Sequence, residues 1–220
     1  MSDEFPQLRE DTLAALAMFQ AEQIQKAEEL KSGKIGKVDE DWQLSQFWYD
    51  DATSRTLVDE SIAAALVSPK RPAWIACVSS PTLVQFFHEH DAYKSGDVRL
   101  RLFEFDARFG IKYPDEFVPY DYKNPSSLPP EMLGTFDVVV ADPPFLAPEC
   151  LIKTAQSIRL LGKKDARIIL CTGAIMEDLA RRLLGMHPTE FEPRHANNLA
   201  NNFACYANYQ TLTFKSLPGK

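Results

Sequence analysis

Features of secreted, membrane-spanning and metal-binding proteins are missing from this chain of 220 residues. It contains no secretory signal and no apolar run of about 18 residues, the length that indicates a membrane-spanning helix. Its four cysteines form no C-x-x-C pair, and its four histidines form no H-E-x-x-H motif. We therefore expect reduced, buried thiols in a cytoplasmic protein, without a disulfide framework, a metal site or a membrane segment.

Positive charge is scarce as well. The chain has 24 lysines and arginines against 31 aspartates and glutamates, which gives a net charge of -7. Nucleic-acid surfaces usually carry a basic footprint, so this balance disfavours DNA or RNA as a partner and suits a basic protein better. With 45% hydrophobic and 25% charged residues, the composition is that of an ordinary globular domain.

The sequence pattern changes near residue 40. Apolar residues recur at helical spacing over residues 13–30, which predicts a helix. A charged linker with two glycines follows at residues 31–40. We assign residues 1–40 to a helical extension and residues 41–220 to the main domain. The helix either packs on that domain or covers a substrate or partner.

Residues 42–49 form the densest aromatic patch of the chain, with four aromatic side chains in eight residues. Aromatic side chains are costly to leave in water because of their large apolar area. The patch therefore either plugs against the core or forms a lip of a binding pocket. The sequence favours neither interpretation.

Short apolar runs alternate with amphipathic stretches along the rest of the chain, which indicates parallel strands linked by helices. The expected strands are residues 73–78, 97–106, 116–122, 136–141 and 166–173, and the expected helices are residues 51–66, 148–161 and 174–185 with another from residue 82. Two closing strands are expected at residues 189–193 and 203–209. The polar loop between them is either a plain connector or part of a substrate entrance, with Arg194 and Asn197 as contacts.

The strand at residues 136–141 ends in Asp142-Pro143-Pro144-Phe145. The run is short, β-branched and nearly free of polar groups, as in a strand buried on both faces. Proline has no N–H to give to a sheet, so the strand stops there. Asp142 then lies at its carboxyl end, where open α/β sheets bind ligands. A plain strand end with two loop prolines and a core phenylalanine is the simpler alternative.

This Asp-Pro-Pro-Phe turn resembles the fourth motif of class I S-adenosylmethionine-dependent amino-methyltransferases. The resemblance implies that an acidic side chain and a main-chain carbonyl hydrogen-bond the attacking amine while the aromatic ring lines its slot. It also implies the fold class, an α/β fold with a Rossmann-like seven-stranded sheet and helices on both faces.

The cofactor motifs depart partly from that pattern. Ser79-Ser80 follows the first strand, where the resemblance leads us to expect a glycine-rich turn. Two small serines still permit close approach of the backbone. Glu104, with Asp106 as second choice, closes the next strand, where an acidic side chain accepts hydrogen bonds from ribose hydroxyls. A solvated glutamate at a strand end is the alternative.

Seven strings in one order support a closer resemblance, to the eukaryotic elongation factor 1-alpha lysine methyltransferase family, once labelled N6-adenine DNA methyltransferases. The strings are WQLSQFWY at 42–49, IACVS at 75–79, FEFD at 103–106, YDYKNP at 120–125, ADPPF at 141–145, CTGAIME at 171–177 and PRH with NLAN at 193–201. The resemblance implies a monomeric cytosolic enzyme that methylates one lysine of the elongation factor with S-adenosylmethionine as cofactor.

On the matching positions the resemblance implies two groups of site residues and no metal. The catalytic turn is Asp142, Pro143, Pro144 and Phe145. The cofactor-binding residues are Cys77, Ser79, Ser80, Glu104, Asp106, Tyr120, Asp121 and Asp142. Among them, Asp121 is the candidate partner of the adenine amino group, because it follows the third strand.

The expected chemistry is an in-line displacement by a lysine amine. A free lysine has a pKa of about 10.4, so the amine must first lose a proton. An apolar slot beside Phe145 would lower that pKa by desolvation. Asp142 and the main-chain carbonyl of Pro143 or Pro144 would then hold the neutral amine in line, and this alignment would supply most of the rate.

Two other functions stay open. The same turn serves enzymes that methylate the adenine amino group of DNA or RNA, with Phe145 stacking on a flipped base. The acidic charge balance argues against that function. The second open function is that of a binding module, a methyltransferase fold without catalytic activity. The missing glycine motif supports it, whereas Glu104 and the intact turn at Asp142 argue against it.

Overall fold

The structure is a computed structural model that describes residues 46–197 and 202–214. The expected N-terminal helix, the linker and the domain boundary near residue 40 lie outside the described residues. The same holds for residues 42–45 of the aromatic patch and for residues 198–201 of the polar loop.

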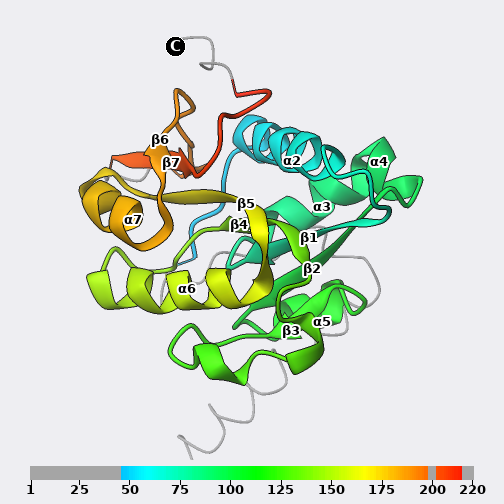
Figure 1. The fold of residues 1–220 in the computed structure, drawn as a ribbon, viewed down its shortest axis with the longest axis horizontal. Helices are drawn as coiled ribbons and strands as arrows, with labels where there is room; N and C mark the ends of the chain where they lie inside the picture. The colour runs from blue at the N-terminus through cyan, green and yellow to red at the C-terminus, as the bar shows by residue number, and fades with distance from the viewer. Residues whose placement is uncertain (1–45, 198–201, 215–220) are drawn as a thin grey trace, which may run out of the picture. The chain divides into compact units, whose positions relative to one another are not determined.

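A seven-stranded sheet in the order β3-β2-β1-β4-β5-β7-β6 forms the centre of the domain (Figure 1). Strands β1 to β5 pair in parallel, and β7 runs antiparallel to both β5 and β6. The strands are β1 (Ala73–Val78), β2 (Val98–Glu104), β3 (Phe117–Pro119), β4 (Phe136–Ala141), β5 (Gly162–Gly173), β6 (His187–Pro188) and β7 (Phe203–Ala207). The strand order reverses between β1 and β4, which is where open α/β sheets bind their ligands.

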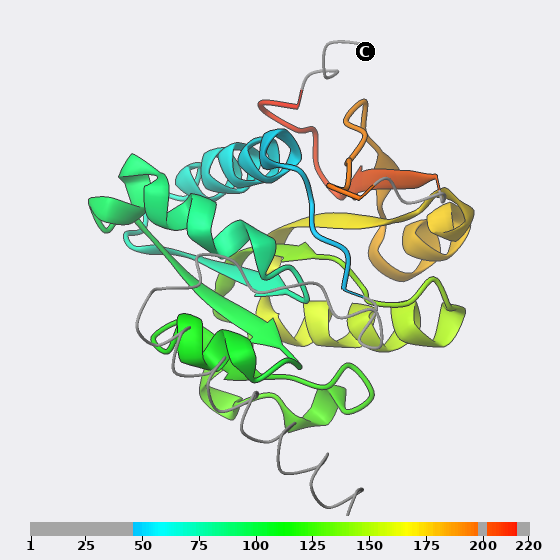
Figure 2. The same cartoon turned by 180° about the vertical axis from the view of Figure 1, so that it is seen from behind.

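Helices cover both faces of this sheet. They are α2 (Asp51–Leu66), α3 (Thr82–Glu89), α4 (Asp91–Lys94), α5 (Arg108–Lys112), α6 (Pro148–Leu161) and α7 (Glu177–Leu184). Helices α2 and α3 lie on one face and α6 on the other in both ribbon views (Figures 1 and 2). Ala76 and Val78 of β1 belong to the core that α6 and α7 cover. Because side chains alternate along a strand, the one residue between them points to the opposite face of the sheet.

Four elements have the bounds that the sequence predicts, namely helices α2 and α6 and strands β1 and β4. Helix α2 begins where it does because the Asp50 carboxylate accepts a hydrogen bond from Thr53 N at 2.7 Å and caps the first turn. Strand β3 is the outermost strand of the sheet, next to β2.

Two expected features are wrong. The strand expected at residues 166–173 begins earlier, because β5 starts at Gly162, directly after α6. The strand expected at residues 189–193 is replaced by the shorter β6 just before it. Thr189 binds Cys205 O through both its backbone N and its hydroxyl, at 2.9 and 3.0 Å, and the pairing with β7 ends there.

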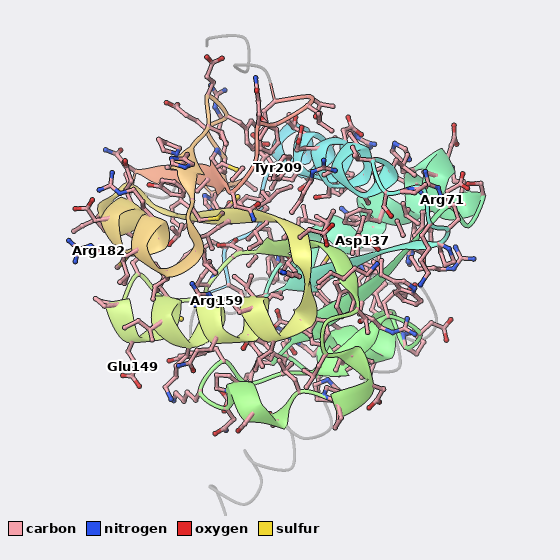
Figure 3. All side chains as sticks on the ribbon, viewed as in Figure 1. Arg71, Asp137, Glu149, Arg159, Arg182 and Tyr209 are labelled. Atoms are coloured by element: carbon pink, nitrogen blue, oxygen red, sulfur yellow. The ribbon has the colours of Figure 1, made fainter. Side chains whose placement is uncertain are left out.

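Asp137, labelled in Figure 3, binds two neighbouring strands near the start of β4. Its carboxylate accepts from Lys163 Nζ at 2.6 Å and from Trp74 N at 2.9 Å. Asp137 thus joins β4 to β5 and β1, a structural role at the start of the strand.

All four cysteines are buried and free. The described residues hold no group of three or more acidic, histidine or cysteine side chains arranged to bind a metal ion. Within those same residues, no helix combines the length and the apolar character that crossing a bilayer requires.

Candidate active site

A cavity of about 290 Å³ opens at the carboxyl edge of the sheet. Its walls come from the segments that follow β1, β2, β3 and β4, from the segment before α2 and from two residues near β7. The lining residues are 46–49, 79–82, 104–105, 120–123 and 142–145, together with His195 and Phe203. Because the ends of parallel strands meet at one edge, this cavity collects most of the site residues expected from the sequence.

Ser79 makes the turn that follows β1. Its φ of 51° is a left-handed conformation that favours glycine, and it is the only described residue other than glycine with a positive φ. Its N–H donates to Phe103 O at 2.9 Å, which ties the turn to β2. The backbone therefore adopts a conformation that a glycine-rich turn would supply, with a serine in place of glycine.

Ser80, 2% exposed, lines the cavity in the same turn. Its hydroxyl has no hydrogen bond of ordinary geometry, although it lies close enough to the Cys77 sulfur to donate weakly to it. Cys77 is fully buried outside the cavity wall, and burial raises the pKa of its thiol. Ser80 thus offers a ligand a free hydroxyl, whereas Cys77 supports the turn from the core.

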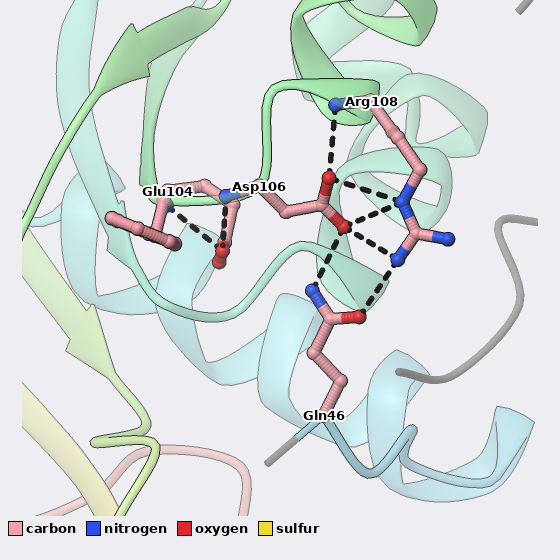
Figure 4. A network of polar contacts seen from close by, with 5 residues as sticks. Gln46, Glu104, Asp106 and Arg108 are labelled. Carbon is pink, nitrogen blue, oxygen red and sulfur yellow. Dashed lines mark hydrogen bonds and ion pairs between the residues drawn. The ribbon is translucent and has the colours of Figure 1, made fainter. Parts of the chain in front are cut away.

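Glu104 ends β2 with its side chain folded back on the chain (Figure 4). Its Oε1 accepts from the backbone N of Phe105 at 2.9 Å and of Asp106 at 3.0 Å. Among the described residues nothing donates to Oε2. Burial raises the pKa of Glu104 to about 7, although the two backbone N–H groups oppose that shift. The carboxyl therefore retains one oxygen for a ligand hydroxyl.

Asp106 lies outside the cavity wall, and its oxygens are already occupied (Figure 4). The Arg108 Nε donates to them at 2.8 and 3.0 Å, and Gln46 Nε2 donates at 3.0 Å. Burial alone would raise the pKa of Asp106, but these hydrogen bonds outweigh it and hold the pKa below its usual value. The geometry gives Asp106 a positioning role between β2 and the segment before α2.

Tyr120 and Asp121 form the wall after β3. The Tyr120 hydroxyl donates to Ser157 Oγ of α6 at 2.9 Å, so its ring is fixed against the cavity while its polar end is turned to the helix. The Asp121 carboxylate accepts from Lys123 N at 2.9 Å and from Asn124 Nδ2 at 3.3 Å. Asp121 thereby shapes the turn while it remains in the cavity lining.

Asp142 continues the pairing of β4, because its N–H donates to Val78 O at 3.0 Å. Its Oδ2 accepts from the Tyr49 hydroxyl at 2.6 Å. Burial raises the pKa of Asp142 to about 7, the charge of Glu104 adds to that shift, and the Tyr49 hydrogen bond opposes it. The cavity therefore holds a carboxyl group that changes its charge near neutral pH.

Pro143, Pro144 and Phe145 complete the turn after β4 and all line the cavity. The Phe145 ring is 40% exposed and lies 5.9 Å from the Tyr122 ring, centroid to centroid. The turn thus presents an acidic side chain and an aromatic ring to the same space, as the motif predicts.

The segment before α2 closes the cavity from a distant part of the sequence. Its residues 46–49, which we call the strap, lead away from the start of α2 toward α6 (Figure 2). Ala196 N donates to Trp48 O at 2.8 Å, and Tyr49 forms a β-bridge with His195. These residues line the cavity, and Tyr49 is also buried in the core. That this cavity is a cofactor or substrate pocket stays a prediction.

Relatives of known name match nearly the whole chain. The family model described as "Probable N6-adenine methyltransferase" matches residues 40–211. A protein-lysine N-methyltransferase of Caenorhabditis elegans is 70% identical, with 97% of this chain and 98% of that protein covered. EEF1A lysine methyltransferase 1 of Gallus gallus is 46% identical (94% and 95% covered), and the Homo sapiens protein of that name is 45% identical (95% and 94%).

This chain belongs to the elongation factor 1-alpha lysine methyltransferase family. The resemblance inferred from its motifs is confirmed. A solved structure also shares the fold, a branched-chain polyamine synthase mutein from Thermus thermophilus with N4-aminopropylspermidine and 5'-methylthioadenosine. Its TM-score is 0.58 at 12% identity, with 82% of this chain and 62% of that chain covered.

Several wall residues, among them Tyr49, His195 and Phe203, were not predicted as individual site residues. Tyr49 was one ring of an aromatic patch with two interpretations, His195 belonged to one of the matching strings without a role assigned to it, and Phe203 had no motif signal. They reach the cavity because the strap pairs with the segment around His195, a contact across almost 150 positions of the chain. Arg194 and Asn197, the expected contacts of an entrance loop, are not in the cavity lining.

Proposed function

We propose that this protein is an S-adenosylmethionine-dependent protein-lysine N-methyltransferase and that its substrate is translation elongation factor 1-alpha. The relatives at 45–46% identity carry that factor in their names, and the relative at 70% identity is named a protein-lysine N-methyltransferase. In this structure the proposal rests on Asp142, a half-buried carboxyl held at the end of β4 beside an exposed aromatic ring.

The residues at the edge of the sheet fit S-adenosylmethionine. Ser79 in its left-handed turn lets the backbone approach a ligand closely, and the buried Ser80 hydroxyl is free to bind one. Glu104 keeps one oxygen for ribose hydroxyls, and Asp121 is our candidate for the adenine amino group. When bound, S-adenosylmethionine supplies a methyl group that a positively charged sulfur activates.

Asp142 is placed to receive the lysine amine. Tyr49 occupies Oδ2, which leaves Oδ1 to accept a hydrogen bond. The carboxylate attracts the incoming ammonium group and then orients the nitrogen once its proton is lost, and the Pro143 carbonyl accepts a second N–H. These two acceptors fix the direction of the nitrogen lone pair.

Phe145 and Tyr122 form the apolar side of the entrance. Because desolvation disfavours the charged ammonium, these rings lower the pKa of a lysine side chain from its usual value of about 10.4. They also exclude water from the reacting nitrogen. The rings and Asp142 thus act together, since the rings favour the neutral amine and the carboxylate orients it.

The proposal includes a cytoplasmic monomer. An elongation factor works where proteins are synthesised, so its modifying enzyme is placed there too. One chain supplies every wall of the cavity, so a monomer suffices. The net charge of -7 favours a basic protein surface over nucleic acid.

Transfer of label from tritiated S-adenosylmethionine tests this function. Elongation factor 1-alpha, single-stranded DNA and double-stranded DNA are offered in parallel to the wild-type protein and to Asp142→Ala. We expect label on the elongation factor and a loss of about 100-fold or more in the variant. Label on DNA would replace the lysine function with the adenine one. If no substrate is labelled and S-adenosylmethionine does not raise the melting temperature, the protein is a binding module without methyltransferase activity.

A further inference from the structure

The strap places a phenol against the catalytic carboxyl. Tyr49, 4% exposed, donates from its hydroxyl to Asp142 Oδ2 at 2.6 Å. That distance is short for a hydrogen bond between two oxygens, as expected when the acceptor is charged. One oxygen of Asp142 is therefore held by the protein before any substrate arrives.

Tyr49 is itself fixed from both sides. Asp50 N donates to Arg194 O at 3.0 Å and Ala196 N donates to Trp48 O at 2.8 Å, so the backbone on each side of Tyr49 is paired. The His195 ring lies 5.0 Å from the Tyr49 ring, centroid to centroid. The phenol is thus held in one position, and its hydroxyl has a defined direction toward β4.

We propose that Tyr49 is a positioning residue for methyl transfer, which fixes the Asp142 carboxylate with Oδ1 directed at the substrate amine and stabilises its charged form. This inference rests on the proposed lysine methyltransferase function. It assigns to the strap a role in the reaction, beyond covering the cavity. A tyrosine that only packed against the core would leave the charge of Asp142 unaffected.

The other groups that face Asp142 do not stabilise its charge. Glu104 from β2 is acidic and adds to the rise of the Asp142 pKa. Burial raises the pKa of the Cys150 thiol of α6. A hydrogen bond with Cys205 and then burial raise the pKa of the Cys171 thiol of β5, so both thiols remain neutral. Within the described part of the chain no lysine or arginine pairs with Asp142. Tyr49 is the side-chain donor that opposes the loss of its charge.

Replacement of Tyr49 by phenylalanine removes the hydroxyl and keeps the ring. We expect the acid limb of the kcat/KM profile on elongation factor 1-alpha to move to higher pH by about one unit, because a hydrogen bond to a charged group is lost. At pH 7 kcat should fall by about 10-fold and recover in part at alkaline pH. A carbon-13 NMR titration of the Asp142 carboxyl in both proteins should show the same displacement.

A fluorinated tyrosine at position 49 provides a second variant with the opposite sign. Its more acidic phenol is a stronger donor, so the acid limb should move to lower pH. Tyr209→Phe is the matched control, because the Tyr209 hydroxyl donates to Glu60 at 2.8 Å and neither residue lines the cavity. Tyr209 is labelled in Figure 3. We expect that control to keep the wild-type pH profile.

The outcomes separate the two proposals. If wild-type protein transfers no methyl group to the elongation factor at any pH, the proposed function fails, and the NMR titration still tests Tyr49. If wild-type protein is active and both Tyr49 variants keep its pH profile and its Asp142 titration, the role of Tyr49 is refuted.

Discussion

Burial and function act in opposite directions on Asp142. In the unfolded chain its pKa is about 3.9, whereas burial raises it to about 7 in the folded protein. Between these two values the folded protein holds a proton that the unfolded chain has released, so this carboxyl lowers stability as the pH rises from about 4 to about 7. The charge that we propose attracts the substrate lysine is thus a source of instability in the free protein.

Asp142→Asn should separate these two effects. We expect methyl transfer to fall by at least about 100-fold, while the free energy of unfolding at pH 8 rises by about 1–2 kcal/mol because no charge is buried. Thermal melts from pH 5 to pH 8 measure the difference, which should grow with pH. Glu104→Gln should shift stability in the same direction. A difference that stays constant over this range would contradict the raised pKa of Asp142.

Ser79 is the other residue of the site with an unusual property, its left-handed backbone conformation. Its left-handed conformation costs about 1 kcal/mol for a residue with a Cβ. Glycine avoids that cost, but it loses more conformational entropy on folding because its unfolded chain is freer.

We therefore expect Ser79→Gly to stay within about 1 kcal/mol of wild type and to bind S-adenosylhomocysteine normally. Ser79→Val should lose about 2 kcal/mol and bind more weakly, since a β-branched residue tolerates this conformation poorly. Denaturant unfolding and titration calorimetry measure both properties. Equal behaviour of the two variants would show that the turn does not depend on this conformation.

Among the elements, the strap is held at two places. Tyr49 binds Asp142 at one end, and Gln46 binds the Asp106 carboxylate at the other, where Arg108 completes the network (Figure 4). The two ends therefore have different roles. The first acts on the proposed catalytic carboxyl, and the second fixes the strap to the end of β2, next to Glu104.

Arg108→Met tests the second attachment. With Asp106 deprived of its ion pair, the strap should loosen and the KM for S-adenosylmethionine should rise by about 5- to 10-fold, with the acid limb of the pH profile unchanged. Arg181→Met is the control, because Arg181 pairs with Asp178 on the exposed surface of α7. An unchanged KM, or a shifted pH profile, would show that the two ends of the strap do not act separately.

For the molecule as a whole, the elements near the active site follow from local sequence. The run at residues 136–141 and the two prolines after it determine where β4 ends, and the alternation of strands and helices predicts the sheet that surrounds it. These features depend on residues close together in the chain, so the catalytic turn and Glu104 could be located from the sequence alone.

Contacts between distant segments could not be predicted in the same way. Tyr49 reaches Asp142 across 93 positions, and no local pattern encodes that pairing. Asp106 and Glu104 are two residues apart and both acidic, so the sequence does not distinguish their roles. The structure shows that Arg108 forms an ion pair with Asp106, whereas Glu104 lines the cavity. The left-handed turn at Ser79 was likewise hidden, because a glycine motif was the expected signal.

Peptide mass spectrometry of elongation factor 1-alpha tests the proposed function most directly. The factor is prepared from cells that lack this enzyme and is incubated with S-adenosylmethionine and either wild-type protein or Asp142→Asn. We predict that one lysine gains methyl groups with wild-type protein and that the same peptide stays unmodified with the variant. An unmodified elongation factor after incubation with wild-type protein that binds S-adenosylmethionine would contradict the proposed substrate.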